Sequence, residues 1–263
     1  MRYRPYLLLF IILFSCAPKK SQIDFADIQN ELNKKFTHGK KLFDKKKYAR
    51  AKDDFDYIIL NDRGSEMGKE ARYYQAESLF KLKQYSDAIS SYERFLQYSD
   101  DNTKNEFCRF RVCECYYNIS NKHNRDQSNN DIALETLQMF IDDFSNSKFL
   151  DMAEEFILDL RLRKAEKLHE TGRLYLKEKE FDSAIIYFNN VIDNYYDTNY
   201  ADESRISIIF LHLLEKENKD ARLYFNNNKE KFIDIEKQLE AQNLLDKFNS
   251  KSSWFSNMVR LYK

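Results

Sequence analysis

The stretch of residues 71–101 contains two short segments in which apolar side chains recur at the three- and four-residue spacing of an amphipathic helix. A polar segment that ends at Tyr85 separates them, which predicts two helices joined by a turn. Small residues at Ala76 and Ala88 would let the antiparallel helices cross closely. The apolar positions are Ala76, Leu79 and Phe80 in the first segment and Ala88, Tyr92 and Phe95 in the second.

The same spacing of small and aromatic residues recurs along the chain, with a shift of 37 residues between the first two copies and again between the last two. Each unit leaves a hydrophobic face uncovered, so neighbouring units must stack into a solenoid. The pattern resembles the tetratricopeptide repeat and predicts an all-α solenoid of about five helix pairs. The clear copies are Gly39, Tyr48, Ala51 and Phe55; Ala76, Tyr85, Ala88 and Tyr92; and Gly172, Phe181, Ala184 and Phe188; weaker ones are Ala133 with Leu137 and Ala221 with Phe225.

The first 15 residues have the pattern of a targeting segment. Arg2 and Arg4 precede an apolar run that is shorter than the roughly 20 residues a membrane-spanning helix needs, which is typical of a signal peptide. Its end, residues 13–16, resembles a bacterial lipobox, and this resemblance implies that Cys16 becomes the acylated first residue of the mature chain. The alternative is an ordinary signal peptide with a cysteine at this place by chance.

The pattern predicts four parts of the chain. Residues 1–15 form a signal peptide that is removed, residues 16–30 a lipid-anchored tether, residues 31–248 the repeat solenoid, and residues 249–263 a C-terminal tail. The tail carries several large apolar residues, among them Trp254, and is expected either to cap the last repeat or to bind a partner. No acidic run, of the kind that resembles the surface-export signal of Bacteroidetes lipoproteins, follows Cys16. We therefore expect a location on the periplasmic face of the outer membrane.

The amino-acid composition further limits the classes of function that the chain can have. The chain has 43 basic and 43 acidic residues, so no basic excess favours nucleic acid as a partner. Four glycines and two prolines suit long helices with short connections. Cys108, Cys113 and Cys115 fall on one predicted helix, and we interpret them as small buried residues. A metal site that combines them with His123 is the alternative.

Two features interrupt the simple repeat. Residues 120–130 are polar and lengthen the third unit by eight residues, which indicates a surface loop, either a contact site or a tolerated insertion. Residues 148–179 keep a helical pattern throughout and predict that the first helix of the fourth repeat is extended at its N-terminal side. Its apolar stripe comprises Met152, Phe156, Leu160, Ala165, Leu168 and Tyr175.

The chain resembles the BamD family of tetratricopeptide lipoproteins in four features. They are the lipobox, the repeats, residues 124–127 before Ala133, and the long helix leading into Gly172. The resemblance covers residues 16 to about 225. It implies a place in the β-barrel assembly machine of the outer membrane, with BamA as partner through its POTRA domains. It also implies contact with unfolded outer-membrane proteins, and we expect the part from the third repeat onward to face BamA.

The resemblance also suggests where a peptide binds. In such repeats the residues three before and four after the small residue of the first helix tend to face the concave surface. In the first three repeats these positions are all aromatic, so we expect a groove for the aromatic C-terminal segment of an unfolded barrel protein. The alternative is that these side chains are partly buried between neighbouring helices. They are Phe36, Phe43, Tyr73, Phe80, Phe110 and Tyr117.

No spacing typical of an enzyme is present. The sequence lacks a nucleotide-binding loop, a nucleophile elbow and paired metal-binding histidines, so we expect neither catalysis nor a cofactor other than the lipid on Cys16. A binding scaffold is the favoured function. The second possibility is a periplasmic tetratricopeptide lipoprotein that serves another envelope system, such as cell-wall or pilus assembly.

Overall fold

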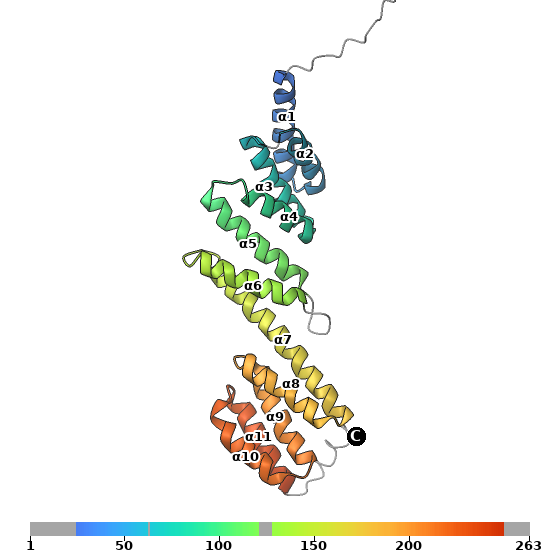
Figure 1. Cartoon of the computed structure of the whole chain (residues 1–263), viewed down its shortest axis with the longest axis vertical. Coiled ribbons are helices and arrows are strands. Elements are labelled where there is room, and N and C mark those ends of the chain that lie inside the picture. Colours follow the sequence, from blue (N-terminus) through green and yellow to red (C-terminus); the bar gives the residue numbers. More distant parts are fainter. Residues whose placement is uncertain (1–24, 63, 121–127, 250–263) are drawn as a thin grey trace, which may run out of the picture.

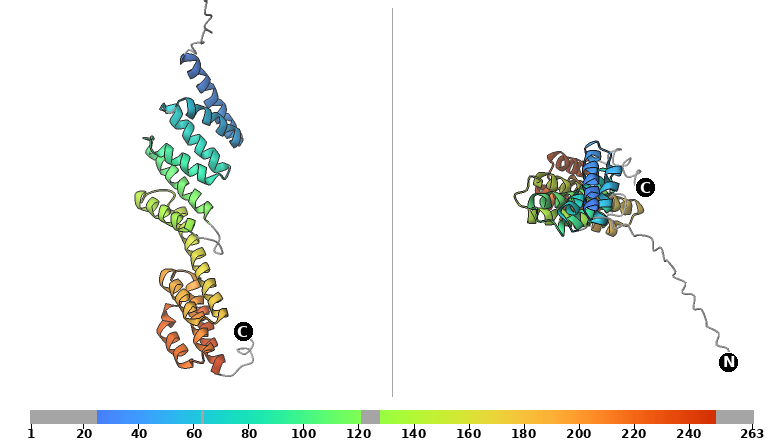
Figure 2. Two further views of the ribbon diagram at one scale, coloured as in Figure 1. Left: turned by 45° about the vertical axis from the view of Figure 1, so that its right-hand side comes forward. Right: turned by 90° about the horizontal axis from the view of Figure 1, so that it is seen from above.

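The computed structural model describes residues 25–62, 64–120 and 128–249. Within these ranges the chain forms eleven α-helices and one short 3-10 helix, stacked into an elongated solenoid (Figures 1 and 2). The all-α class and the five helix pairs predicted from the repeats are confirmed. The helices are α1 (Phe25–Asp44), α2 (Tyr48–Asn61), α3 (Glu66–Lys81), α4 (Tyr85–Leu96), α5 (Asn102–Ile119), α6 (Ser128–Asp143), α7 (Leu150–Glu178), α8 (Phe181–Asn194), α9 (Asn199–Leu214), α10 (Asn218–Asn228), η1 (Lys229–Lys231) and α11 (Ile235–Asn249).

Close helix crossings explain the small residues of the repeat. A Cβ atom on Gly39 would lie 3.0 Å from the ring of Phe55, and one on Gly172 would lie 2.7 Å from the ring of Phe188. Such distances leave no room for a side chain, so glycine lets the aromatic ring pack against the helix backbone. The alanines expected at the crossings, Ala51, Ala88, Ala133, Ala184 and Ala221, are completely buried.

The turns between paired helices share one backbone geometry. The turns after α1, α3, α7 and α9 each contain a lysine with positive φ, between 58° and 67°, and these four are the only non-glycine residues with positive φ in the described ranges. In each turn two backbone N–H groups bond back to the last carbonyls of the preceding helix; Lys83, for example, donates to Phe80 and Gln84 donates to Leu79. This is the Schellman arrangement, in which glycine is the usual residue. The lysines are Lys46, Lys83, Lys179 and Lys216.

The long helix α7 joins the two halves of the solenoid (Figure 1). Ala153 and Leu160 in its first half pack with Phe110 and Leu137 of the third pair, and Leu176 near its end packs into the core of the last two pairs. The predicted extension of this helix is therefore confirmed. Met152, which was expected on its apolar stripe, is 40% exposed and lies outside the core.

The ends of the solenoid differ from the expected boundaries. The first helix already begins at Phe25, six residues before the expected start of the repeats. At the other end α11 covers the last pair, with Ala241, Leu244 and Leu245 packed against the cores of α9 and α10. Helix α6 begins at Ser128, so the last residues of the expected 120–130 loop are helical. Among the described helices, none has both the length and the apolar character that crossing a membrane requires.

Candidate functional site

The six aromatic residues expected to line a groove lie on the first helices of the first three pairs, α1, α3 and α5. Five of them are half-buried, and Phe110 is only 2% exposed. The ring of Phe110 stacks on Phe149 with centroids 4.6 Å apart and also packs against Phe140 and Phe156. Phe110 is therefore a core residue and offers no surface to a peptide, which corrects its assignment to the groove.

Neighbouring helices hold the remaining rings in place. Phe36 and Phe43 both meet Tyr74 of the next pair edge-on, at centroid distances of 6.2 and 5.6 Å. Tyr73 packs against Phe95 and Phe107, and Phe80 packs against Tyr85. Tyr117 stacks on Phe156 of α7 at 4.1 Å. The half-buried state of these rings agrees with the alternative weighed from the sequence, partial burial between helices.

A cationic side chain lies beside four of the five half-buried rings. The closest is the guanidinium of Arg111, 4.4 Å from the centroid of Phe80, and a cation in this range is attracted to the ring face. The surface that these rings share, here called the inner surface, is thus both aromatic and cationic. The four pairs are Lys40 with Phe36, Lys104 with Tyr73, Arg111 with Phe80 and Arg163 with Tyr117.

A buried hydrogen-bond network fixes the middle of this surface. Glu77, only 5% exposed, accepts hydrogen bonds from the hydroxyl of Tyr92 and from Nε of Arg111, and Arg111 also donates to Glu114 at 2.6 Å. Although burial of Arg111 disfavours its charge, Glu77 and Glu114 outweigh that effect and raise the pKa of the guanidinium. Glu77 and Glu114 are therefore fixed partners of Arg111.

A hollow of about 430 Å³ opens next to Tyr73, between α3, α5 and the connection into α7. Its aromatic walls are Tyr73, Phe107 and Phe149, and two lysines stand at its rim. Lys104 forms an ion pair with Glu70, whereas Lys148 has no carboxylate within ion-pair distance in the described ranges. Glu106 also lines the hollow, and its carboxylate accepts a hydrogen bond from the hydroxyl of Ser147 at 2.6 Å. The site therefore joins aromatic surface to Lys148, a cation without an ion-pair partner in the described ranges, a combination that suits an aromatic residue carrying a carboxylate.

The sequence pattern predicted the aromatic rings of the inner surface but not the cationic side chains beside them. Lys104, Arg111 and Arg163 lie outside the positions that the repeat register selects, and Lys148 lies in a connection between helices. One signal was available for Arg111, which follows Phe107 by four residues and so shares its face of α5.

The remaining candidate residues fall into two groups. Cys16, His123 and Trp254 lie outside the described residues. Cys108, Cys113 and Cys115 are buried free thiols, as expected of small core residues, and burial raises the pKa of each to about 12. A thiol with so high a pKa is a poor metal ligand and a poor nucleophile.

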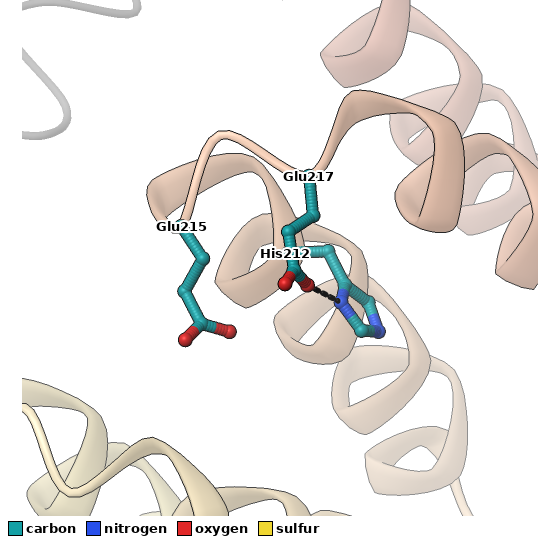
Figure 3. A group of neighbouring side chains, drawn as sticks. All are labelled: His212, Glu215 and Glu217. Atoms are coloured by element: carbon teal, nitrogen blue, oxygen red, sulfur yellow. Dashed lines mark hydrogen bonds and ion pairs between the residues drawn. The ribbon is translucent and has the colours of Figure 1, made fainter.

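A cluster of possible metal ligands lies at the turn from α9 to α10. Donor atoms of His212, Glu215 and Glu217 lie within 4.8 Å of one another, and Figure 3 shows the imidazole directed at the Glu217 carboxylate. That contact measures 3.1 Å. Burial, followed by repulsion from Glu217, raises the pKa of Glu215. Imidazole and carboxylate groups can bind a divalent cation. His212 and Glu217, however, already bind each other through a hydrogen bond and need no cation to be satisfied.

A second histidine is placed beside a hydroxyl, but in the core. Nδ1 of His169 lies 3.0 Å from Oγ of Ser204, and its Nε2 lies 3.7 Å from Glu203. Ser204 is completely buried and His169 is 3% exposed, so no substrate reaches the pair. Burial lowers the pKa of His169 to about 4 and keeps the ring neutral. The arrangement is a packed structural contact.

Comparison with known proteins agrees with this architecture. A chain from Rickettsia prowazekii, described as outer membrane protein assembly factor BamD, is 30% identical over 77% of this chain and 80% of its own length. The protein of the same description from Caulobacter vibrioides is 22% identical over 74% of this chain and 64% of its own length. The profile of the family described as YfiO, outer membrane lipoprotein, matches residues 28–230. This chain therefore belongs to the YfiO family of outer membrane lipoproteins.

Proposed function

We propose that this protein is an assembly factor for outer-membrane proteins and acts as a non-enzymatic scaffold. The observation that carries the proposal is the similarity to relatives described as BamD, which covers about three quarters of this chain. The architecture supports it, because a stack of helix pairs offers an extended binding surface. The second possibility from the sequence, an adaptor of another envelope system, has no comparable relative in its support.

The proposed partner is BamA, bound through its POTRA domains by the part of the solenoid from the third pair onward. The test is co-purification from solubilised outer membrane with a tagged full-length chain. BamA should dominate the recovered proteins, and a chain ending before Asn199 should recover much less of it while circular dichroism still shows helix. Recovery of cell-wall or pilus proteins without BamA would favour the second possibility instead.

The anchor is proposed to be a lipid on Cys16. The chain belongs to a lipoprotein family, and Cys16 ends the short apolar run of the targeting segment. Cys16→Ser should leave the protein unprocessed or release it into the soluble fraction. A processed Cys16→Ser protein that stays at the membrane in cells lacking its partners would contradict lipid anchoring.

The substrate is proposed to be the C-terminal segment of an unfolded barrel protein, bound by the aromatic and cationic inner surface. Outer-membrane barrel proteins commonly end in an aromatic residue with a free carboxylate. The hollow beside Tyr73 matches both groups, because its rings can pack on an aromatic side chain and Lys148 can pair with the carboxylate.

A photo-crosslinkable peptide that ends in phenylalanine tests this assignment on the mature chain. Adducts should map to α3, α5 and the connection before α7, and Lys148→Gln should weaken binding. The matched control is Lys177→Gln, an exposed lysine on the other half, which should leave binding unchanged. A peptide with a C-terminal amide should bind the wild type as weakly as the free acid binds Lys148→Gln. Equal binding of acid and amide, or adducts confined to residues 150–249, would contradict the assignment.

A further inference from the structure

A strongly basic stretch covers α1 and the first residues of α2. Residues 25–52 contain nine lysines and arginines against three carboxylates, a formal charge of +6. Residues 53–263 contain 30 against 39, a formal charge of −9. α1 and the start of α2 are therefore strongly basic, whereas the rest of α2 carries Asp53, Asp54 and Asp56.

Most of these basic side chains are exposed and have no carboxylate partner. Lys35 and Lys52 pair with Asp54 and Asp56, at 3.1 and 2.6 Å. The other seven have no carboxylate within ion-pair distance in the described part of the chain, so their charge is available to a ligand. They are Lys34, Lys40, Lys41, Lys45, Lys46, Lys47 and Arg50, and all are exposed. We call these seven residues the basic face.

Three members of the basic face lie on one side of α1, and Lys40 lies on another side, over the ring of Phe36. Lys41 follows Lys34 by seven residues and precedes Lys45 by four, so the three side chains lie on one side of the helix. Lys46 and Lys47 continue this line into the turn between α1 and α2. Figure 1 shows α1 at one end of the solenoid and α10 and α11 at the other, so the basic face lies far from the last helix pairs.

The position of this face in the chain indicates what it meets. Eight residues, 17–24, separate Cys16 from the start of α1. Even fully extended, eight residues span at most about 30 Å, which is also about the length of the 20-residue helix α1. A lipid on Cys16 therefore keeps the first residue of α1 within about 30 Å of the bilayer surface, and α1 brings residues 41–47 to that surface when the helix lies along the membrane. This step rests on the proposed lipid anchor.

We propose that the basic face of α1 binds the anionic headgroups of phospholipids at the membrane surface. One acylated residue fixes only a point, whereas a row of lysines beside it orients the solenoid relative to the bilayer. Lysine and arginine side chains near a negatively charged surface each add to membrane affinity. The net charge of −9 over the remainder repels the same surface, so the opposite end is directed away from it.

Vesicle binding by the mature chain carrying Cys16→Ser tests the proposal without the lipid. The protein should sediment with vesicles made of phosphatidylglycerol and phosphatidylcholine in equal amounts, but not with pure phosphatidylcholine. Binding should fall as salt is added, because screening weakens surface electrostatics. Changing Lys41, Lys45, Lys46 and Lys47 together to Gln should lower the partition coefficient by about fivefold for each lysine that contacts headgroups.

A matched variant shows whether position matters. Lys177, Lys179, Lys216 and Lys219 are also exposed and without a carboxylate partner in the described ranges, and they lie on the other half of the solenoid. Changing these four to Gln removes the same total charge and should not weaken vesicle binding. Equal losses in both variants, or no preference for phosphatidylglycerol, would overturn the proposal.

Two further outcomes are informative. If the basic-face variant loses an acidic protein partner from solubilised membranes but binds vesicles like the wild type, the face serves a protein and the lipid assignment is wrong. Vesicle binding requires neither the lipid anchor nor BamA. Absence of vesicle binding would therefore contradict only the headgroup proposal and not the assembly function. Failure to recover BamA would contradict only the assembly function and not the headgroup proposal.

Discussion

The two halves of the solenoid use the same repeat register for different surfaces. Two positions of the first helix can be compared between pairs, three residues before and four residues after its small residue. In the first two pairs these positions hold half-exposed aromatic rings, such as Phe36 and Phe80. The fourth pair places His169 and Leu176 there, with 3% and 2% exposure. The third pair lies between these cases, with Phe110 buried and Tyr117 half-buried.

The difference arises from what covers each first helix. The start of α7 lies over α5, where Phe149 and Phe156 cover Phe110. Further along, α9 supplies Tyr200 and Ser204 against His169, and α11 packs on α9. The surface thus closes from the third pair onward. A repeated backbone does not by itself provide repeated binding sites, because the covering helices decide which units stay open.

The largest expected loss of stability comes from removing the contact that holds α11 against the last helix pairs. The buried carboxylate of Asp202 pairs with Arg205 at 2.7 Å and accepts the backbone N–H groups of Ile233 and Asp234, just before α11. Asp202→Ala leaves a buried guanidinium without its partner and should cost about 3–5 kcal/mol in urea unfolding. The exposed pair of Arg222 and Asp246 is the control, and Asp246→Ala should cost less than about 1 kcal/mol. Equal losses of unfolding free energy in the two variants would mean that Asp202 does not hold α11 in place.

Overpacking a helix crossing should affect both halves similarly. Ala88 and Ala184 are completely buried at equivalent positions of the second and fourth pairs. Replacing either with Leu inserts volume into a filled core and should lower the free energy of unfolding by about 1–3 kcal/mol. Thermal and urea unfolding measure the change. An unchanged Ala88→Leu protein would show that the two halves do not share one packing register.

The buried His169 makes the closed half sensitive to pH. Burial lowers its pKa to about 4 in the folded chain, against about 6.5 when unfolded. The unfolded state then binds more protons between these values, so this contribution to stability is present above pH 6.5 and is lost as the pH falls toward 4. The loss between pH 7.5 and 5 should be about 2 kcal/mol. His169→Gln should flatten the slope of stability with pH in this window; an unchanged slope would assign the dependence to other groups.

The smallest expected effect concerns the turn that the halves share. Lys83 and Lys179 have φ of 61° and 65°, a conformation that costs an L-residue more than glycine. Each lysine is exposed, so replacing either with Gly should raise stability by up to about 1 kcal/mol, and by the same amount in both halves. A gain in one half alone would show that the two turns are not equivalent in energy. Lys81→Gly, in the helical last turn of α3, should instead destabilise.

The repeat units were predictable because their main constraint is local and steric. Glycine or alanine must stand where two paired helices cross, and an aromatic ring from the partner helix fills the remaining space. Gly172 and Phe188 show this rule at its closest approach, 2.7 Å for a Cβ atom. Such a constraint leaves a fixed spacing in the sequence, and the helix pairs follow from it. The length of α7 was predictable from its unbroken helical pattern of apolar residues instead.

The exposure of the inner surface was not predictable in the same way. Phe110 has the same register position as Phe36 and Tyr73, and its own helix gives no sign that Phe149 will cover it. The cations beside the rings come from other positions or other helices; Arg163 reaches Tyr117 from 46 residues further along the chain. Contacts of this kind depend on how pairs stack, which a repeat pattern does not specify.

The three buried thiols of α5 have a consequence for how the protein matures. In an unfolded chain exposed to an oxidising compartment, Cys108, Cys113 and Cys115 are ordinary thiols with a pKa near 8.5, and they can form wrong disulfides with each other or with other chains. Folding raises their pKa to about 12 and shields them from solvent, which lowers the reactive thiolate fraction by about three orders of magnitude. Folding of the third helix pair therefore protects the three thiols against oxidation, without any disulfide in the described helices.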